Sequence, residues 1–531
     1  MTRTRQWSRL MQPAPFDLAV IGAGATGLGV ALDAALRGFS VVVLDSHDFG
    51  AGTSSRSTKL LHGGVRYLAQ GHLGLVKQAL AERATVMRIA PHLAQALPFI
   101  VPAYHWWHRP FYGVGLKLYD WIAGASGLGA TQWLSTSQTR SALPGIQTAG
   151  LRGGVQYWDG QFDDARLALA LARTIERAGG LAINHAAVTG LWSDMPIRDH
   201  VSFTLEIKDQ LDQNGTARIR ARAVVNATGV WVDELRLMAR PAPTSAMRRM
   251  VSPSQGVHIV LDRSFMPSDH AMLIPHTRDG RVLFAIPWMG SLLLGTTDTP
   301  IDEITHDPLA FDHEIDFILH EAGRYLLRTP KRSDILSVWV GLRPLVADDG
   351  AGVGTQTLSR NHAVVTDANR LITVTGGKWT TYRAMAEEVL QTCFDSGLLS
   401  YRAGGMTNHH ALVGAPRSGV PLTSMTQPLG PHLLGAEAEQ LATCPGHDHE
   451  LGWGVTEAMV RYSVRYEYAH TVEDVLARRW RVLYLDAARA CAMAREVAEI
   501  IRNETGHDPG LDRFMALAVN HLPGKAMKNP A

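Results

Sequence analysis

Residues 17–45 read DLAVIGAGATGLGVALDAALRGFSVVVLD, and this stretch decides the fold at the N-terminal end of the chain. The apolar run at 17–21 predicts a buried parallel strand, because strands covered on both faces have near-continuous apolar sequence. Residues 25–37 are rich in alanine and leucine and predict a helix, and residues 39–44 predict a second buried strand. A strand–helix–strand unit of this kind opens a doubly wound α/β domain.

The glycines of this stretch predict a dinucleotide-binding turn. Gly22 allows the tight turn after the first strand, Gly24 lets the backbone approach a pyrophosphate, and Gly27 lets helix and strand pack closely. The helix N-terminus adds unpaired N–H groups and positive potential for the phosphates. Asp45 follows Gly22 by 23 residues, where its carboxylate can accept the ribose hydroxyls. The motif alone does not separate NAD from FAD.

Three other segments are candidates for the same nucleotide site. The Thr-Ser-Ser run at 53–55 can reach the pyrophosphate with hydroxyl and N–H groups, although a solvated loop is the alternative interpretation. Gly229 and the glycine pair at 376–377 each follow a short apolar strand. The candidate cofactor-binding residues are Gly22, Gly24, Gly27, Asp45, Thr53, Ser54, Ser55, Gly229, Gly376 and Gly377.

Composition excludes several classes of protein. The chain has 531 residues, 46% of them hydrophobic, which favours a large buried core over disorder. Its 51 basic and 49 acidic residues leave a net charge of +2, so nothing indicates a nucleic-acid partner. Three scattered cysteines form no metal or disulfide pattern, and no metal site is predicted. No apolar stretch is long enough to predict a membrane-spanning helix.

The chain divides into four predicted regions. We expect a basic extension at 1–15, which lacks a secretory signal pattern, and an oxidoreductase region at 16–395. Many Gly, Pro and Ser residues predict an irregular linker at 396–450, and helical spacing predicts an all-helical domain at 451–531. The nucleotide-binding parts are about 16–85, 155–235 and 345–395, and the mostly antiparallel substrate-domain parts are about 86–154 and 236–344.

Five separated segments resemble one family. They are TSSRSTKLLHGGVRYL at 53–68, LFAIPWMGSLLLGTTDT at 283–299, GLRPL at 341–345, GGKWTTYR at 376–383 and YEYAHTVEDVLARRWRVLYL at 466–485. In this order, these segments are similar to those of the aerobic, FAD-dependent glycerol-3-phosphate dehydrogenase family. The resemblance covers about residues 16–505. It leaves out much of 396–450. At position 45 this sequence has an aspartate, where the family more often has a glutamate.

The resemblance implies the fold and the cofactor. The expected fold is α/β: a glutathione-reductase-like, Rossmann-type FAD domain, an antiparallel substrate domain like that of D-amino-acid oxidase, and a C-terminal all-helical domain. It implies oxidation of sn-glycerol 3-phosphate to dihydroxyacetone phosphate and electron transfer to a membrane quinone. It also implies a cytoplasmic protein on the inner face of the membrane. A homo-oligomer is possible, and the iron–sulfur cysteine motifs of anaerobic relatives are missing.

A phosphate monoester carries close to two negative charges near pH 7, so its pocket needs several cations. The candidates within the family-like segments are Arg66, Arg343 and Lys378, of which the last two follow predicted strands. Arginine offers a planar fork for phosphate, whereas lysine acts as a point charge. Tyr67 and Thr381 complete the predicted substrate-binding set. A surface ion pair is the alternative role for any one of these cations.

Two histidines are candidates for proton transfer, because the pKa of histidine lies near neutrality. His62 precedes a glycine pair, and His258 begins a predicted strand. A structural role is an equally good interpretation of each, so the base stays unassigned. The predicted catalytic set is His62, His258, Arg343 and Lys378.

Residues 104–121, YHWWHRPFYGVGLKLYDW, concentrate aromatic side chains that a soluble surface rarely shows together. Proline and charges prevent this segment from crossing a bilayer, but Trp and Tyr favour the level of the lipid headgroups. We expect membrane contact here, and a buried aromatic cluster is the alternative. The apolar residues concerned are Trp106, Trp107, Phe111, Tyr112, Leu116, Tyr119 and Trp121.

Three rival functions share the nucleotide motif. A glycerol-3-phosphate oxidase would return its electrons to dioxygen. An amine or amino-acid oxidase of the same fold binds a single carboxylate charge, for which Arg66, Arg343 and Lys378 together would be excessive. A non-enzymatic flavin-binding protein would hold FAD that glycerol 3-phosphate cannot bleach.

Overall fold

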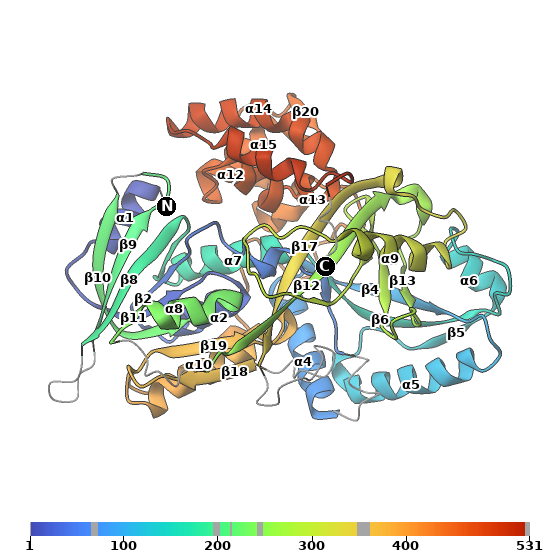
Figure 1. Cartoon of the computed structure of the whole chain (residues 1–531), viewed down its shortest axis with the longest axis horizontal. Helices are drawn as coiled ribbons and strands as arrows, with labels where there is room; N and C mark the ends of the chain where they lie inside the picture. The colour runs from blue at the N-terminus through green and yellow to red at the C-terminus, as the bar shows by residue number, and fades with distance from the viewer. Residues whose placement is uncertain are drawn as a thin grey trace.

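The computed structural model describes residues 2–64, 73–194, 202–212, 215–241, 248–347 and 362–525, and two large sheets organise them (Figure 1). The first sheet has nine strands within these residues, in the order β11-β8-β9-β10-β1-β2-β7, with β19 beside β10 and β18 beside β19. Its strands are β1 (Phe16–Ile21), β2 (Val41–Leu44), β7 (Leu181–Ile183), β8 (Ala186–Asp194), β9 (Ser202–Asp209), β10 (Thr216–Asn226), β11 (Ala239–Arg240), β18 (His362–Thr366) and β19 (Ile372–Gly376).

The centre of this sheet is parallel and buried, as the apolar runs predict. Strand β1 lies between β2 and β10, and its last residue, Ile21, aligns with Leu44 on one side and Asn226 on the other. The carboxyl ends of three strands therefore meet at one level. Three helices pack into the core with the sheet: α2 (Ala25–Leu36), α7 (Asp164–Arg177) and α10 (Tyr382–Asp395).

The second sheet has ten strands within the described residues, in the order β16-β12-β15-β14-β13-β4-β6-β3, with β17 beside β12 and β5 beside β6. Its printed pairings are antiparallel except for β13 with β4. The strands are β3 (Leu60–Leu61), β4 (Ala94–Pro102), β5 (Gln132–Leu134), β6 (Gly154–Phe162), β12 (Val251–Asp262), β13 (Ala271–Ile274), β14 (Leu283–Trp288), β15 (Ser291–Gly295), β16 (Thr299–Pro300) and β17 (Ile335–Val346).

The strands cross the predicted limits between the two parts of the oxidoreductase region. Strands β3 and β6 belong to the second sheet, although 16–85 and 155–235 were expected in the nucleotide-binding part. Strand β11 joins the first sheet, although 236–344 was expected in the substrate domain. Apolar periodicity shows that a segment is a strand, but the sheet that it joins depends on a partner far away in the sequence.

Helices surround both sheets, and the C-terminal helices form a separate group above them in Figure 1. This group consists of α12 (Glu457–Tyr466), a π-helix η9 (Asp474–Arg479), α13 (Val482–Leu485), α14 (Ala487–Thr505) and α15 (Leu511–Val519), preceded by the hairpin β20 (Glu450–Gly452) and β21 (Val455–Thr456). The other helices are α1 (Arg3–Leu10), α4 (Leu73–Ile89), α5 (His108–Ala123), α6 (Thr136–Ala142), α8 (Val232–Met238), α9 (Asp312–Gly323) and α11 (Ala438–Leu441).

Two segments expected to lie outside the folded regions are packed against them. Helix α1 buries Trp7 and Leu10 in the core of the first sheet, and Arg3 forms an ion pair with Asp209 at 2.6 Å. Part of the basic extension expected at 1–15 is therefore a folded helix, whose apolar face the basic composition does not reveal. The segment 396–450 is irregular, yet it buries leucines such as Leu412 and Leu433.

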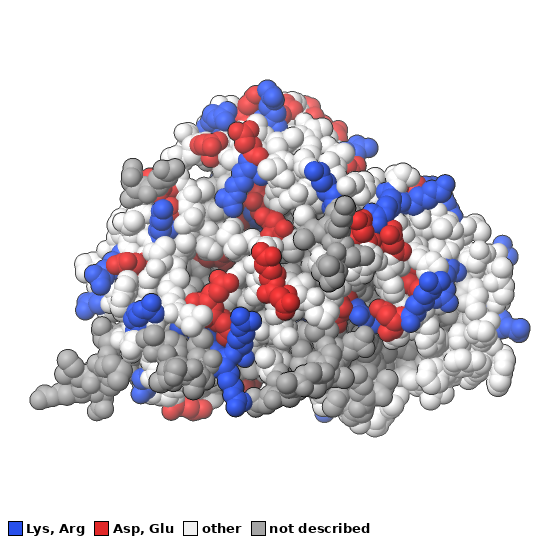
Figure 2. Space-filling model, viewed as in Figure 1, with Lys and Arg blue, Asp and Glu red and all other residues white. Residues whose placement is uncertain are grey.

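Acidic and basic side chains are interspersed on one face of the molecule. On the face shown in Figure 2, groups of Lys and Arg lie among groups of Asp and Glu on an otherwise uncharged described surface. This mixture of signs agrees with the small net charge of the sequence.

Buried ion pairs join the C-terminal helices to the first sheet. The carboxylate of Asp48, which is fully buried, forms an ion pair with Arg478 at 2.5 Å and another with Arg479. Asn184 donates a further hydrogen bond to Asp48 at 2.8 Å. The two arginines help to hold the pKa of Asp48 below its usual value despite burial. A buried carboxylate of this kind is stable only while its partners remain.

We expect Asp48→Ala to destabilise the protein by about 3–5 kcal/mol, because two buried guanidinium groups lose their partner. The midpoint of chemical denaturation measures this change. Asp316→Ala is the matched control, since its exposed pair with Arg332 should contribute less than about 1 kcal/mol. Equal effects of the two substitutions would contradict the assignment.

Candidate active site

A cavity of about 1630 Å³ is lined by residues of both sheets. Its lining contains most of the residues that the sequence predicted: Gly22, Gly24, Asp45, Thr53, Ser54, His62, Gly229, His258, Arg343, Gly376, Gly377 and Lys378. Gly27, Ser55 and Thr381 are not among the residues that line the cavity. Arg66 and Tyr67 fall outside the described residues, so their predicted role is not placed.

The glycine turn is shaped by close backbone contacts. Gly22 has φ +99°, and a Cβ there would lie 2.6 Å from the carbonyl oxygen of Ala227 at the end of β10. A Cβ on Gly27 would lie 1.9 Å from the carbonyl oxygen of Gly22. Gly24, with φ −78°, is the N-cap of α2 and faces the cavity. Thus Gly22 and Gly27 shape the turn, whereas Gly24 leaves open the space above the helix N-terminus.

Asp45 follows β2 and points into the same end of the cavity. Its carboxylate accepts hydrogen bonds from the backbone N–H of Ala23 at 2.7 Å and of His47 at 2.9 Å. Burial raises the pKa of Asp45 to about 6, so the group is still largely ionised at neutral pH. An oriented carboxylate beside the glycine turn suits the two hydroxyls of an adenosine ribose.

The 3₁₀-helix η1 (Thr53–Ser55) covers this end of the cavity. The Ser54 hydroxyl accepts a hydrogen bond from the Ala25 N–H at 2.9 Å, and the indole of Trp379 donates to the Ser54 carbonyl at 2.8 Å. Thr53 donates to the carbonyl of Leu342 at 2.6 Å. With the glycines, these residues line a cradle that fits a dinucleotide diphosphate. Ser55 is not among the lining residues, and its carbonyl accepts hydrogen bonds from Lys59 and Arg481.

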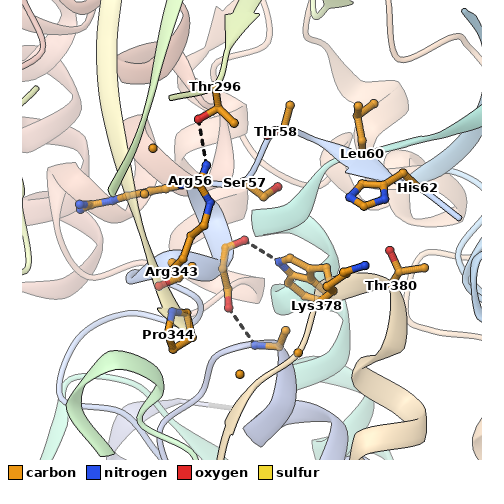
Figure 3. Close-up of a pocket in the computed structure, with 18 of the residues that line it drawn as sticks. Arg56, Ser57, Thr58, Leu60, His62, Thr296, Arg343, Pro344, Lys378 and Thr380 are labelled. Carbon is orange, nitrogen blue, oxygen red and sulfur yellow. Dashed lines mark hydrogen bonds between the residues drawn. The ribbon is translucent and has the colours of Figure 1, made fainter. Parts of the chain in front are cut away.

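Arg343 comes from β17 and carries positive charge into the cavity from the second sheet (Figure 3). Its guanidinium donates to the Asp298 carboxylate at 2.9 Å, the Thr297 carbonyl at 2.8 Å and the Thr296 hydroxyl at 3.2 Å. These contacts fix the plane of the guanidinium. Because Asp298 offsets part of its charge, a dianion in this cavity needs a second cation.

Lys378 supplies a second cation from the first sheet. It follows β19 and the glycines at 376–377, where Gly376 has φ +80° and Gly377 has φ +73°. Lys378 is the N-cap of the short helix η6 (Trp379–Thr381). In Figure 3, Arg343 and Pro344 lie on one side of the pocket, and His62, Lys378 and Thr380 lie on the other.

His258 lies on β12 with its ring held by neighbours. Its Nε2 is 3.0 Å from the Thr58 hydroxyl, and the ring stacks on Trp339 with centroids 4.1 Å apart. Burial, together with the charges of Lys59 and Arg343, lowers the pKa of His258 well below its usual value. The imidazole is therefore neutral at physiological pH and can accept a proton.

Sequence reasoning missed Lys59, which is fully buried beside the cavity lining. Its ammonium donates to Asp164 at 2.7 Å and to the Ser55 carbonyl at 2.8 Å, and it lies 4.5 Å from the centroid of the Trp339 ring. Burial and the charge of Arg481 lower the pKa of Lys59 to about 7. The position of Lys59 within the family-like loop was the only sequence signal for it.

One group of described residues brings metal-ligating atoms together. Atoms of Asp48, His185 and Asp474 lie within 4.8 Å of one another. The two carboxylates already pair with Arg478, and His185 contacts Asp474 at 3.0 Å. Their charge is thus balanced within the protein, and the group serves as an ion-pair network.

Comparison with known proteins places the chain in a class that agrees with this site. Residues 17–383 match the model of the FAD-dependent oxidoreductase family, and residues 432–510 match the C-terminal domain of α-glycerophosphate oxidase. A solved glycerol-3-phosphate dehydrogenase from Bacillus halodurans in complex with FAD has a TM-score of 0.73. It is 26% identical, over 98% of this chain and 97% of that one.

Curated relatives narrow the class. A probable mitochondrial glycerol-3-phosphate dehydrogenase of Caenorhabditis elegans is 38% identical over 95% of this chain and 73% of its own length. The mitochondrial glycerol-3-phosphate dehydrogenase of Homo sapiens is 37% identical over 96% of this chain and 73% of its own length. The chain belongs to the FAD-dependent glycerol-3-phosphate dehydrogenase family. The predicted family, fold class and FAD cofactor are confirmed.

We expect Gly24→Val to abolish FAD binding while the chain stays folded. The backbone at Gly24 tolerates a side chain, but a Cβ would lie 3.0 Å from the Ser54 hydroxyl, and the branched methyls would extend into the diphosphate cradle. Flavin absorbance per protein after purification measures the loss. Gly74→Val is the control, since no atom lies within 4 Å of its added Cβ. Full flavin content in the Gly24 variant would refute this placement.

Proposed function

We propose that the chain oxidises sn-glycerol 3-phosphate to dihydroxyacetone phosphate and passes the electrons to a membrane quinone. The observation that carries this proposal is the convergence of a nucleotide turn, Arg343 and Lys378 on one cavity. When bound, FAD accepts the hydride from the secondary carbon of the substrate. The chain's own residues bind the phosphate, orient the alcohol and take the hydroxyl proton.

Arg343 and Lys378 bind the phosphate group in this proposal. The guanidinium of Arg343, which its contacts with Asp298 and Thr297 hold in place, brings positive charge close to the phosphate, and the ammonium of Lys378 adds a point charge from the opposite sheet. Arg66 and Tyr67 remain predicted contributors. Thr381 is not among the lining residues and donates to the Lys378 carbonyl at 3.3 Å, so we assign it to the positioning of Lys378.

His258 accepts the hydroxyl proton in this proposal. A ring that is neutral before the substrate binds has one unprotonated nitrogen, which can take this proton. A phosphate dianion bound nearby raises the pKa of His258, since negative charge favours the imidazolium form. His62, which lines the cavity and is only half-buried, contacts the substrate in this proposal.

We expect Lys378→Ala and Arg343→Ala each to lower kcat/KM for glycerol 3-phosphate. Loss of a partner from a buried charged contact costs about 2–5 kcal/mol, which is roughly 30-fold to a few thousand-fold. Steady-state kinetics with an artificial electron acceptor measures the effect. Lys331→Ala, on the exposed surface, is the control. The rate of flavin reduction in the unsubstituted enzyme should be much lower with glycerol than with glycerol 3-phosphate. Equal rates would show that no phosphate site exists.

Helix α5 supports contact with a membrane surface. Trp106 is 78% exposed, Phe111 64% and Trp121 79%, so the alternative of a buried aromatic cluster is wrong for these residues. It holds for Leu116 and Tyr119, which are buried. Among the described residues, no helix is long and apolar enough to cross a membrane. Exposed tryptophans beside Arg and Lys suit a helix lying at the level of the headgroups.

The triple substitution of Trp106, Trp107 and Phe111 by Ser should move the enzyme from vesicles into the soluble fraction. These side chains supply apolar area for the lipid surface and little of the core, so the variant should fold and keep FAD. Co-sedimentation with anionic vesicles measures the change. The matched control replaces Tyr401, Val420 and Leu422, which are also exposed, by Ser. Unchanged sedimentation of the triple variant would exclude this surface.

The proposal also covers the electron acceptor, the cellular location and the oligomeric state of the protein. We place the protein on the inner face of the membrane, in the cytoplasm, with quinone rather than dioxygen as the acceptor. Stopped-flow mixing of the reduced enzyme with each acceptor separates a dehydrogenase from an oxidase. A homo-oligomer stays a prediction that light scattering of the purified protein checks.

A further inference from the structure

The cavity has an apolar region that a small phosphorylated alcohol does not require. The residues that line it include Phe99, Val101, Leu116, Leu273 and Phe284, which come from β4, α5, β13 and β14. Glycerol 3-phosphate is small and strongly charged, so these surfaces offer it no favourable contact. An apolar ligand would gain free energy by covering them.

This region reaches the molecular surface at α5. Phe111, Val114 and Leu118 line the cavity, yet they are 64%, 68% and 43% exposed. The exposed aromatic face proposed for membrane contact is therefore continuous with the wall of the cavity. A water-soluble acceptor needs no apolar rim, whereas a ligand dissolved in the bilayer needs one at the level where it leaves the lipid.

One hydrogen-bonded polar pair lies among the apolar lining residues near this rim. The Tyr112 hydroxyl and His276 Nε2 are 2.8 Å apart, and both residues line the cavity. Tyr112 is half-buried, and burial raises the pKa of its phenol to about 12, so the hydroxyl keeps its proton. His276 is exposed to solvent. The pair joins a protonated hydroxyl inside the cavity to an imidazole that exchanges protons with water.

We propose that Tyr112 and His276 form the acceptor subsite, where Tyr112 donates a hydrogen bond to a carbonyl oxygen of a lipid-soluble quinone that enters beside α5. This inference rests on the proposed function, in which a quinone takes the electrons. It specifies where the quinone binds and which side chain supplies a proton.

The reaction at this subsite balances in electrons and protons. Reduction of a quinone to a quinol takes two electrons and two protons, and the two carbonyl oxygens become hydroxyls. Reduced flavin releases two electrons and two protons when it returns to the oxidised state. Tyr112 passes its proton to one quinone oxygen and recovers a proton through His276 from solvent. A flavin proton reaches the second oxygen, and the remaining flavin proton leaves to solvent.

The test compares the two half-reactions of FAD-loaded enzyme carrying Tyr112→Phe, which removes only the hydroxyl. Bleaching of the flavin by glycerol 3-phosphate should stay within about twofold of the parent rate. Reoxidation by a short-chain quinone should slow at least about tenfold, whereas reoxidation by ferricyanide, which takes electrons without protons, should not change. His276→Gln should show the same pattern, and Tyr401→Phe is the exposed control.

Binding provides a readout that does not depend on turnover. Quenching of tryptophan fluorescence by the short-chain quinone should give a weaker dissociation constant for Tyr112→Phe than for the parent enzyme. Unchanged quinone binding and reoxidation would overturn the subsite, and so would equal slowing with ferricyanide, since that pattern indicates only a structural contact. A parent flavin that glycerol 3-phosphate cannot bleach would contradict the proposed function itself, and the subsite with it.

Discussion

Two buried aspartates control how the C-terminal helices meet the FAD-binding part of the chain. Asp48 forms ion pairs with Arg478 and Arg479, and Asp164 forms an ion pair with Arg481 at 3.2 Å. Arg478 and Arg479 end the π-helix η9, and Arg481 follows two residues later as the N-cap of α13. A carboxylate in a dry interior is costly without a partner, so these arginines stabilise the loop that carries Asp48 and the start of α7. The helical domain is thus a structural part of the site.

The same interaction extends to residues of the cavity through short contacts. Asp164 accepts hydrogen bonds from the Ser57 hydroxyl at 2.7 Å and from Lys59 at 2.7 Å. These two residues flank Thr58, whose hydroxyl touches His258 on the other sheet. The position of the histidine therefore depends on an ion pair outside the cavity lining. The buried ammonium also helps to keep the imidazole neutral, because two positive charges cannot both be buried at low cost.

The sequence predicted a structural feature where the contact that determines it joins residues close together in the chain. The nucleotide turn was predictable because Gly22 and Gly27 meet within one strand–helix unit. The reciprocal hydrogen bonds of Thr471 and Asp474 were also predictable from their spacing. The burial of Lys59 could not be predicted, because it depends on the ion pair with Asp164, which is more than 100 residues away in the sequence. No local pattern reveals such a partner.

The two ends of the cavity have opposite character, and this difference follows from the two substrates of the proposed reaction. At one end, Arg343 and Lys378 place charge next to the nucleotide cradle, where a phosphate must be held in water-poor surroundings. At the other end, α5 turns apolar residues both into the cavity and toward the outside. A helix that is apolar on two faces is unfavourable on a fully solvated protein. In the proposed function the exposed face of α5 lies against the lipid, so the helix that completes the cavity would also direct the cavity toward the membrane.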